Sequence, residues 1–300
     1  LEHLTTSDDF LELEEIPERI IFVGGGYIAF EFAHVAARAK AKVTILHRND
    51  KPLKAFDPDM VSLLIERTRR LGVNIHLGHT VTRIKRTAGR LAVCTLSAGR
   101  KACFQADLVV HSAGRKPAID ELNLAAGGIT VENGRIKLDD RLRSVSNEAV
   151  SVAGDAAHQG PPLTPVASLD AQTVVDDLLD KSPTRPDYTG IPSVVFTSPP
   201  LARVGLSEHE ARARVADLRV RHEATFNWFS VRHTGESCAG FKTLVDGAAD
   251  RLVGAHLMTP DAHEIVNLLA LAMQNDLPAS RLRRAALAFP TGGYDMKSML

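Results

Sequence analysis

Apolar positions along the first part of the chain follow two different periods. Short β-branched runs at residues 20–23, 42–46 and 108–112 predict buried strands. Apolar residues at helical spacing after residue 31 and over residues 57–71 predict helices between these strands. Strands that alternate with helices are typical of a parallel α/β sheet, so the sequence predicts a Rossmann-like fold here.

A second pattern interrupts this alternation. Residues 73–77 predict another strand, and residues 80–106 then alternate apolar and polar positions, with turns at Gly89 and near Gly99. Strict alternation is typical of half-buried antiparallel strands joined by tight turns. The sequence therefore predicts a three-stranded antiparallel insert.

The second region starts near Ala118. Residues 149–153 form a β-branched run that leads into Gly154 and Asp155, which predicts a strand with a carboxylate at its end. The carboxyl edge of an open α/β sheet is where ligands bind. An Asp at a strand end could instead cap the next helix, which we expect over residues 168–179.

The third region begins near residue 191 and carries no cofactor loop. A strand near residue 194 leads to a helix with a Ser207–Glu210 capping box. A hairpin around Asp246-Gly247 and an apolar helix over residues 263–273 follow, which predicts an α+β domain. Its apolar helix is most simply core, although part of its surface could be an oligomer contact.

The stretch Ile20–Glu31 contains a glycine-rich turn directly after the first predicted strand. Gly24 is expected to make the tight turn, Gly26 to let phosphates approach the backbone, and Ala29 to keep the helix close to the sheet. The free N–H groups and positive dipole end of that helix favour an anion. The motif by itself could be an ordinary strand-to-helix turn, but a complete β-α-β unit favours a dinucleotide pyrophosphate site.

A basic loop follows the second strand, where proteins that bind NAD usually place an acidic residue. Here the loop holds His47, Arg48, Lys51 and Lys54. A guanidinium binds a 2′-phosphate through charge-assisted hydrogen bonds, whereas a carboxylate would repel it. A solvated basic loop is the alternative, but the position favours NADP over NAD.

Composition narrows the classes of function. The chain has 300 residues, no net charge and 44% hydrophobic residues, which gives no general reason to expect nucleic-acid or membrane partners. No apolar stretch approaches the roughly 20 residues that span a bilayer. Cys94, Cys103 and Cys238 form no metal-ligand cluster, so we expect no metal. A bond between Cys94 and Cys103 is conceivable, but two reduced cysteines in a cytoplasmic protein are the favoured interpretation.

With these blocks in this order, the chain resembles the flavin-dependent pyridine nucleotide–disulfide oxidoreductases, especially the glutathione reductases. The resemblance covers nearly every residue and rests on GGGYIAFE, the basic loop, AGRKP, SVAGDA, LTPVA and FPTGG. It implies an NADP-binding domain over residues 1–118 that is inserted in an FAD-binding domain. Residues 119–189 would complete that FAD domain, and residues 190–300 would form an α+β dimerisation domain.

The resemblance also implies site residues. Tyr27 would gate the nicotinamide pocket, and Glu31 would lie near the nicotinamide and the flavin. Asp155 would bind the flavin ribityl chain, with Thr164 beside the isoalloxazine. The implied NADP-binding residues are Gly24, Gly26, Tyr27, Ile28, Ala29, Glu31, Arg48, Lys54, Gly114 and Arg115, and the implied FAD-binding residues are Gly154, Asp155, Leu163, Thr164, Pro165 and Ala167.

Two departures from the family pattern matter. The family's FAD-adenine glycine loop and CxxxxC redox pair would lie upstream of residue 1, and the chain has no initiator Met, so we expect it to begin inside a longer protein. Where reductases carry His-Pro-Thr-x-x-Glu, this chain has Phe289 and Tyr294. A benzene ring cannot transfer a proton, so acid–base chemistry is lost there. The resemblance further implies a cis Phe289–Pro290 bond.

Two classes of function stay open. The first is an NADPH-dependent flavoenzyme, dimeric through residues 190–300, that passes electrons to a disulfide, quinone, metal ion or nucleotide. The second is a non-catalytic nucleotide-binding or dimerisation remnant, because this piece holds half of an FAD site and is expected to be inactive alone.

Overall fold

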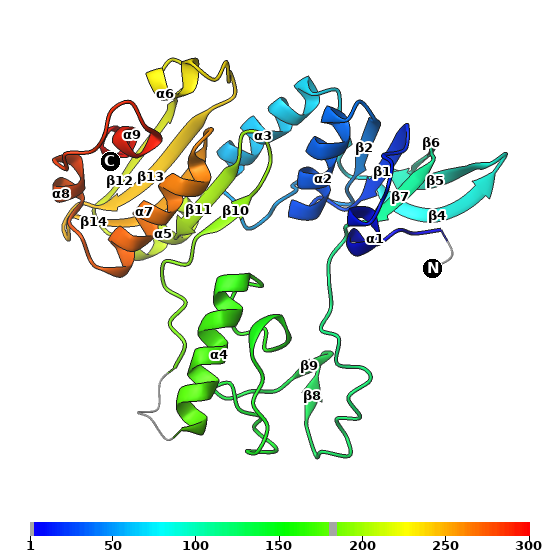
Figure 1. Cartoon of the computed structure of the whole chain (residues 1–300), viewed down its shortest axis with the longest axis horizontal. Helices are drawn as coiled ribbons and strands as arrows, with labels where there is room; N and C mark the ends of the chain where they lie inside the picture. Colours follow the sequence, from blue (N-terminus) through cyan, green and yellow to red (C-terminus); the bar gives the residue numbers. More distant parts are fainter. Residues whose placement is uncertain (1–2, 180–184) are drawn as a thin grey trace. The chain divides into compact units, whose positions relative to one another are not determined.

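The computed structural model describes residues 3–179 and 185–300, which form two compact units. The first unit contains the chain up to Gly114 together with Pro192–Leu300, and the second contains Arg115–Ile191. Residues far apart in the sequence thus form one body in the first unit. Its two parts are coloured blue to blue-green and yellow-green to red in Figure 1.

The N-terminal part of the first unit is a parallel α/β layer. Its sheet has the strand order β3-β2-β1-β7, and every neighbouring pair is parallel. The predicted strands and helices of this part are confirmed. The elements are α1 (Ser7–Leu11), β1 (Arg19–Val23), α2 (Tyr27–Arg38), β2 (Lys42–Leu46), α3 (Pro58–Arg70), β3 (Asn74–His76) and β7 (Leu108–His111).

Helix α3 illustrates how local sequence sets these elements. The Asp57 carboxylate caps the helix by accepting hydrogen bonds from the amides of Asp59 and Met60, and Pro58 occupies the first turn, where no amide donor is needed. Gly72 follows the helix end with φ +87°, a left-handed conformation that glycine adopts without strain. Met60, in the first turn of this helix, is fully buried.

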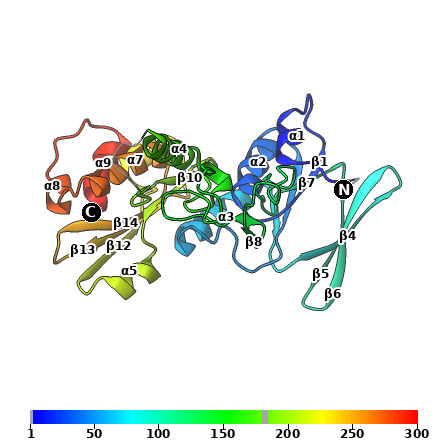
Figure 2. The same ribbon diagram turned by 90° about the horizontal axis from the view of Figure 1, so that it is seen from below.

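The predicted antiparallel insert is confirmed as a sheet of β4 (Thr80–Thr87), β5 (Arg90–Ser97) and β6 (Arg100–Ala106). Gly89 and Gly99 make its turns with φ of +80° and +77°. The sheet extends away from the parallel layer in Figure 2. One expectation was wrong here. Cys94 and Cys103 are not reduced but form a disulfide, because direct register across β5 and β6 brings their Cα atoms to 4.0 Å.

The C-terminal part is an antiparallel sheet of order β10-β11-β14-β13-β12, with α7 packed on β11 and β14. The Ser207–Glu210 capping box, the hairpin around Asp246 and the apolar helix are confirmed. The elements are β10 (Ser193–Val195), β11 (Leu201–Gly205), α5 (Glu208–Arg214), β12 (Leu218–Ala224), α6 (Phe229–Arg232), β13 (Gly240–Asp246), β14 (Arg251–Met258), α7 (Ala262–Gln274), α8 (Ala279–Arg283) and α9 (Gly292–Met299).

A buried ion-pair cluster joins the two parts of the first unit. The Lys242 ammonium on β13 lies 2.9 Å from Asp57, 2.6 Å from Asp59 and 2.9 Å from Glu208, and its side chain is 3% exposed. Burial lowers the pKa of Lys242, but the three carboxylates outweigh it and raise that pKa. The ammonium takes the place that a cation would occupy among these carboxylates, so the cluster is structural.

The second unit has little regular structure. It contains β8 (Val131–Glu132), β9 (Arg135–Ile136), the 3₁₀ helix η1 (Gly154–Ala156) and α4 (Thr164–Leu178). The strand expected at residues 149–153 was wrong, because among the described residues this run forms a single bridge, from Ser151 to Arg143, rather than a continuous ladder. Helix α4 begins at Thr164 rather than residue 168, with Pro165 in its first turn.

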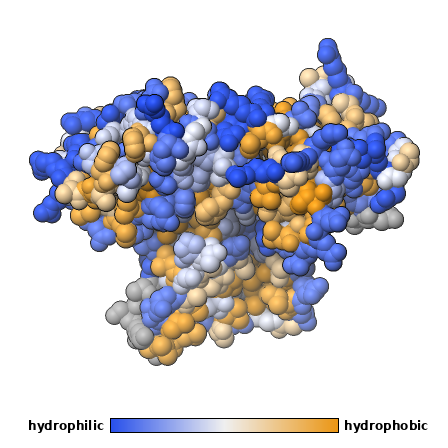
Figure 3. Space-filling view, turned by 45° about the horizontal axis from the view of Figure 1, so that its top comes forward, coloured by the Kyte–Doolittle hydropathy of each residue, from blue (hydrophilic) through white to orange (hydrophobic). Residues whose placement is uncertain are grey.

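The hydrophobic core lies in the first unit. Among the described residues, the large clusters of buried apolar side chains draw only on this unit. The second unit leaves apolar side chains exposed, and orange atoms are frequent on its face in Figure 3. The exposed apolar residues of this unit include Leu122, Val131, Val145, Val175 and Leu178. In the part of the chain that the structure describes, no helix is both long and apolar enough to cross a membrane.

Candidate functional site

The glycine turn after β1 contains one glycine that packing requires and one that faces open space. Gly24 has φ +138°, and a Cβ there would lie 2.0 Å from the Ser112 carbonyl oxygen at the end of β7. At Gly26 the nearest atom to such a Cβ is that same oxygen, 4.0 Å away. Glycine is thus required at position 24 because any side chain would clash with the backbone of Ser112. At position 26 the absence of a side chain leaves the turn open to a ligand.

The start of α2 offers donors to such a ligand. Gly26 is its N-cap residue and provides no capping side chain. Within residues 3–179 and 185–300, the amides of Tyr27, Ile28 and Ala29 donate no hydrogen bond, and the first helical bond runs from Phe30 to Gly26. Free amides and the positive end of the helix dipole make this turn suitable for a phosphate.

The basic loop after β2 is attached to the glycine turn. The amide of Leu53 donates to the Gly25 carbonyl at 2.9 Å, and the His47 ring lies where a Cβ on Gly25 would be, 2.6 Å from its Cγ. Burial lowers the pKa of His47, which hydrogen-bonds the Lys51 carbonyl at 3.2 Å. Arg48 and Lys54 are exposed on this anchored loop.

Glu31 lies further along α2 and faces the C-terminal part of the unit. The Phe196 amide donates a hydrogen bond of 2.8 Å to its Oε1. Burial raises the pKa of Glu31, and that hydrogen bond opposes the rise. Tyr27, one turn earlier, is 44% exposed at the mouth of the glycine turn. Glu31 is therefore fixed in position by a backbone hydrogen bond, while burial disfavours its charged form.

Sequence reasoning missed His34, which lies one helical turn beyond Glu31. Its Nδ1 accepts from the Ser198 amide at 3.1 Å, so its Nε2 carries the hydrogen and donates to Thr68 Oγ1 at 2.9 Å. Burial, followed by the charges of Arg67 and Arg38, lowers the pKa of His34 to about 4. A lone His in a helix gives no sequence signal for these distant contacts.

The residues expected at the flavin lie in the second unit. Gly154 has φ +68°, and its amide donates to Asp170 at 3.0 Å, while Asp155 is exposed. Asp155 does not cap α4, whose N-cap is Leu163 without a side-chain bond. Thr164 and Pro165 are exposed in the first turn, and Ala167 packs against Gly154.

The last two predicted NADP residues lie at the unit boundary. Gly114, with φ +124°, ends the first unit, and Arg115 begins the second. Both are exposed. The φ of Gly114 lies in the region that glycine adopts readily, so this position suits glycine, and the role of both residues at NADP stays a prediction.

At the two positions where the reductases carry His and Glu, the loop at the C-terminus carries the aromatic residues Phe289 and Tyr294. The Phe289–Pro290 bond is cis, as predicted. The Phe289 ring is 66% exposed and lies 5.9 Å from Phe229 and 5.0 Å from Tyr294 between ring centroids. Nearby, burial raises the pKa of Asp295, whose carboxylate accepts a hydrogen bond from Ser230.

This geometry defines a class of protein: a dinucleotide-binding α/β layer with a basic loop, joined to an α+β domain. Two family models match the chain, pyridine nucleotide-disulphide oxidoreductase over residues 2–171 and the dimerisation domain of that family over residues 191–299. The chain belongs to the pyridine nucleotide-disulphide oxidoreductase family.

Individual relatives agree with this family. Mercuric reductase from Staphylococcus aureus is 29% identical over 97% of this chain and 53% of its own length. Glutathione reductase from Burkholderia cepacia is 32% identical over 90% of this chain and 60% of its own. The structure of the HOCl-induced flavoprotein disulfide reductase RclA from Escherichia coli is similar with a TM-score of 0.90 at 30% identity, over 98% of this chain and 67% of that one. The chain thus spans between half and two thirds of these relatives.

Proposed function

We propose that this chain is part of an FAD-dependent NADPH oxidoreductase of the disulfide reductase type. NADPH would supply a hydride to FAD, and FAD would pass the electrons to a disulfide or another acceptor. The observation that carries the proposal is the open glycine turn at Gly26, with a cationic loop anchored beside it. The named reductases among the relatives support it.

The residues of the first unit fit a dinucleotide with a 2′-phosphate. The amides of Tyr27, Ile28 and Ala29 would bind the pyrophosphate, and Gly24 and Gly26 would allow its approach. Arg48 and Lys54 would bind the 2′-phosphate, since both are exposed. His47, rather than an acidic residue, directly follows β2. Gly114, the last residue of this part, and Arg115, the first residue of the second unit, would complete the set of NADP-binding residues. Glu31 would orient the nicotinamide end through its fixed carboxyl group.

The second unit offers matching groups for a flavin. Asp155 would accept hydrogen bonds from ribityl hydroxyls, since its carboxylate is exposed beside the turn at Gly154. Leu163, Thr164, Pro165 and Ala167 lie at or in the first turn of α4, whose uncapped amides suit a polar ring edge. We therefore propose residues 119–189 as part of an FAD-binding domain and residues 1–118 as the NADP-binding domain.

The third domain, residues 190–300, would form a homodimer. The matching dimerisation model and the exposed rings of Phe229 and Phe289 support this. An acceptor that needs a proton from residue 289 is disfavoured, because Phe289 cannot provide one. The disulfide between Cys94 and Cys103 removes the support that cysteine usage gave to a reducing compartment and therefore to a cytoplasmic location.

Nucleotide titration tests the proposal. Arg48→Ala should weaken NADPH binding by roughly ten- to a hundredfold, because a charge-assisted bond to a phosphate contributes about 1.5–3 kcal/mol. NADH binding should stay nearly constant. Lys51→Ala is the matched control, since Lys51 is an exposed cation of the same loop whose backbone carbonyl alone contacts His47. Equal losses for both nucleotides would contradict the role of Arg48.

A further inference from the structure

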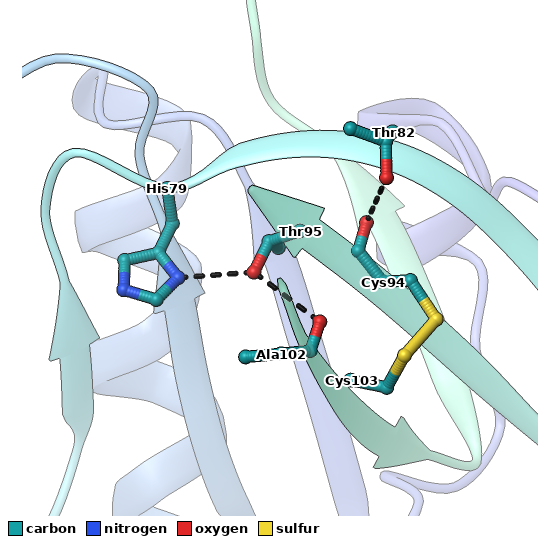
Figure 4. Close-up of a disulfide and its surroundings, with 6 residues drawn as sticks. All are labelled: His79, Thr82, Cys94, Thr95, Ala102 and Cys103. Atoms are coloured by element: carbon teal, nitrogen blue, oxygen red, sulfur yellow. Dashed lines mark hydrogen bonds between the residues drawn. A yellow bond between two sulfur atoms is a disulfide. The ribbon is translucent and has the colours of Figure 1, made fainter. Parts of the chain in front are cut away.

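The outer face of the insert sheet carries an exposed disulfide that the proposed function does not use. Arg83, Cys94 and Cys103 are in direct register across β4, β5 and β6, so their side chains lie in one row on one face. Figure 4 shows the sulfur atoms on the side of the sheet away from His79 and Thr95. Cys103 is exposed, whereas Cys94 is half-buried.

The same face gathers positive charge. Because side chains alternate along a strand, Lys85 and Lys101 lie on the face of the disulfide, two positions from Arg83 and Cys103. Both cations are exposed. The opposite face packs Leu91 and Val93 into the core of the parallel layer. The disulfide therefore lies on the solvent side of the sheet, with cations on the neighbouring strand positions.

No carboxylate balances this charge within the insert. The segment from residue 80 to residue 106 contains no Asp or Glu, although the whole chain has equal numbers of acidic and basic residues. Among described residues, its one ion pair joins Arg90 to Asp107 at 4.0 Å. The basic residues of the segment are Arg83, Lys85, Arg86, Arg90, Arg100 and Lys101.

We propose that Cys94–Cys103 is a thiol–disulfide exchange site for small anionic thiols. The thiolate of such a molecule attacks Sγ of Cys103, the S–S bond breaks, and the Cys94 thiolate leaves. The product is a mixed disulfide on Cys103. A second anionic thiolate attacks the sulfur of the bound thiol, which releases the Cys103 thiolate and one molecule of small-molecule disulfide. Two thiols are oxidised and one protein disulfide is reduced.

The surroundings explain both the attacked sulfur and the choice of thiol. Cys103 is the more exposed of the two sulfur-bearing residues, so a molecule from solvent reaches it first. Arg83 lies beside Cys94 in the row and stabilises the departing thiolate, because cations favour the charged form of a thiol. Arg83, Lys85 and Lys101 together attract an anionic thiol over a neutral one. None of this requires FAD or NADPH.

Rates of exchange with three thiols test the proposal. The full chain, purified without reductant, is mixed with glutathione (anionic), β-mercaptoethanol (neutral) or cysteamine (cationic), and the adduct is trapped with acid and located by peptide mass spectrometry. The Arg83→Gln/Lys101→Gln variant should react about tenfold more slowly with glutathione. Its rate with β-mercaptoethanol should fall less, because there the variant loses only the stabilisation of the departing Cys94 thiolate, and its rate with cysteamine should fall least. The adduct should be on Cys103.

A matched variant separates local from general charge effects. Arg86→Gln/Arg100→Gln removes the same charge from the same two strands but from the opposite face, so it should react like the unmodified chain. Equal slowing with charged and neutral thiols, equal slowing in both variants, or no slowing with glutathione would overturn the proposal. So would free thiols at Cys94 and Cys103 in the reductant-free protein, or an adduct confined to Cys94.

Discussion

Both units contain a β-branched run followed by a glycine turn, but the run forms a strand in only one of them. In each, a β-branched run leads to a glycine with positive φ, Gly24 at +138° and Gly154 at +68°. In the first unit the run becomes β1, paired on both sides by β2 and β7. In the second unit the run forms no strand, and the glycine amide is held by the Asp170 carboxylate instead. A glycine turn is thus encoded locally, whereas a strand depends on its neighbours.

The largest effect should distinguish these two glycines. Gly24→Ala places a methyl group 2.0 Å from a backbone oxygen, so native-state hydrogen exchange should show β1, β2 and β7 destabilised by more than about 4 kcal/mol. Gly154→Ala meets only the Ala167 side chain at 3.0 Å and should lose about 1–2 kcal/mol, confined to the second unit. Similar losses in both variants would show that the two turns are equally constrained.

The cohesion of the first unit should depend on Lys242. Lys242→Met fills the same space but leaves Asp57 buried without a counter-ion, which should lower the free energy of unfolding by about 3 kcal/mol in a urea titration. Lys297→Met, which removes a cation over the Tyr294 ring, is the control and should lose less than about 1 kcal/mol. A loss at Lys242 as small as the control would mean that the ion-pair cluster contributes little to joining the two parts.

The free energy of unfolding of the first unit should depend on pH through the titration of His34. Its pKa is depressed to about 4 in the folded chain, against 6.5 as its ordinary value, so an unfolded chain takes up a proton that the native one does not. The stability is fully present above pH 6.5 and is lost as pH falls towards 4. Between pH 6 and pH 5 the stability that depends on His34 falls by about 1.2 kcal/mol.

His34→Gln tests that share of the pH dependence. The Gln amide can still accept from the Ser198 amide and donate to Thr68, but it does not titrate. Chemical denaturation at the two pH values should therefore show a shallower pH dependence for this variant. His256, whose pKa burial also lowers to about 4, remains and gives a residual slope. An unchanged slope would assign the acid sensitivity to other groups.

The smallest effect on stability should come from Gly26. Because open space faces this residue, Gly26→Ala should lower the free energy of unfolding by no more than about 1 kcal/mol. The methyl group would nevertheless occupy the space meant for the phosphates, and NADPH binding should weaken about tenfold, equivalent to 1.4 kcal/mol. Calorimetric titration measures this loss. Unchanged NADPH affinity would show that the pyrophosphate does not approach Gly26.

Local sequence predicted much of the first unit because its signals are short-range. The Asp57 cap, the turns at Gly89 and Gly99 and the Ser207–Glu210 capping box each depend on residues within a few positions. The contacts that escaped prediction span long separations. Lys242 meets Asp57, and His34 meets Ser198, only because the chain returns to the first unit after residue 191.

The disulfide and the missing strand escaped prediction for different reasons. The sequence left a bond between Cys94 and Cys103 open but favoured reduced cysteines, because the direct register that brings them together is set by the paired strands. Residues 149–153 have strand-forming side chains, yet the described residues offer only Arg143 as a bridge partner. The site residues predicted by resemblance, such as Asp155, stay predictions until ligand binding is measured.

The hydrogen bond from Leu53 to Gly25 has a practical consequence for protein engineering. It ties the loop that carries Arg48 and Lys54 to the turn that would hold the pyrophosphate. If Arg48 and Lys54 bind the 2′-phosphate as proposed, exchanging their side chains should alter coenzyme preference without breaking this bond, because both are exposed and neither forms it. A shortened loop, or a proline at position 53, would remove this hydrogen bond and should weaken the binding of both NADPH and NADH.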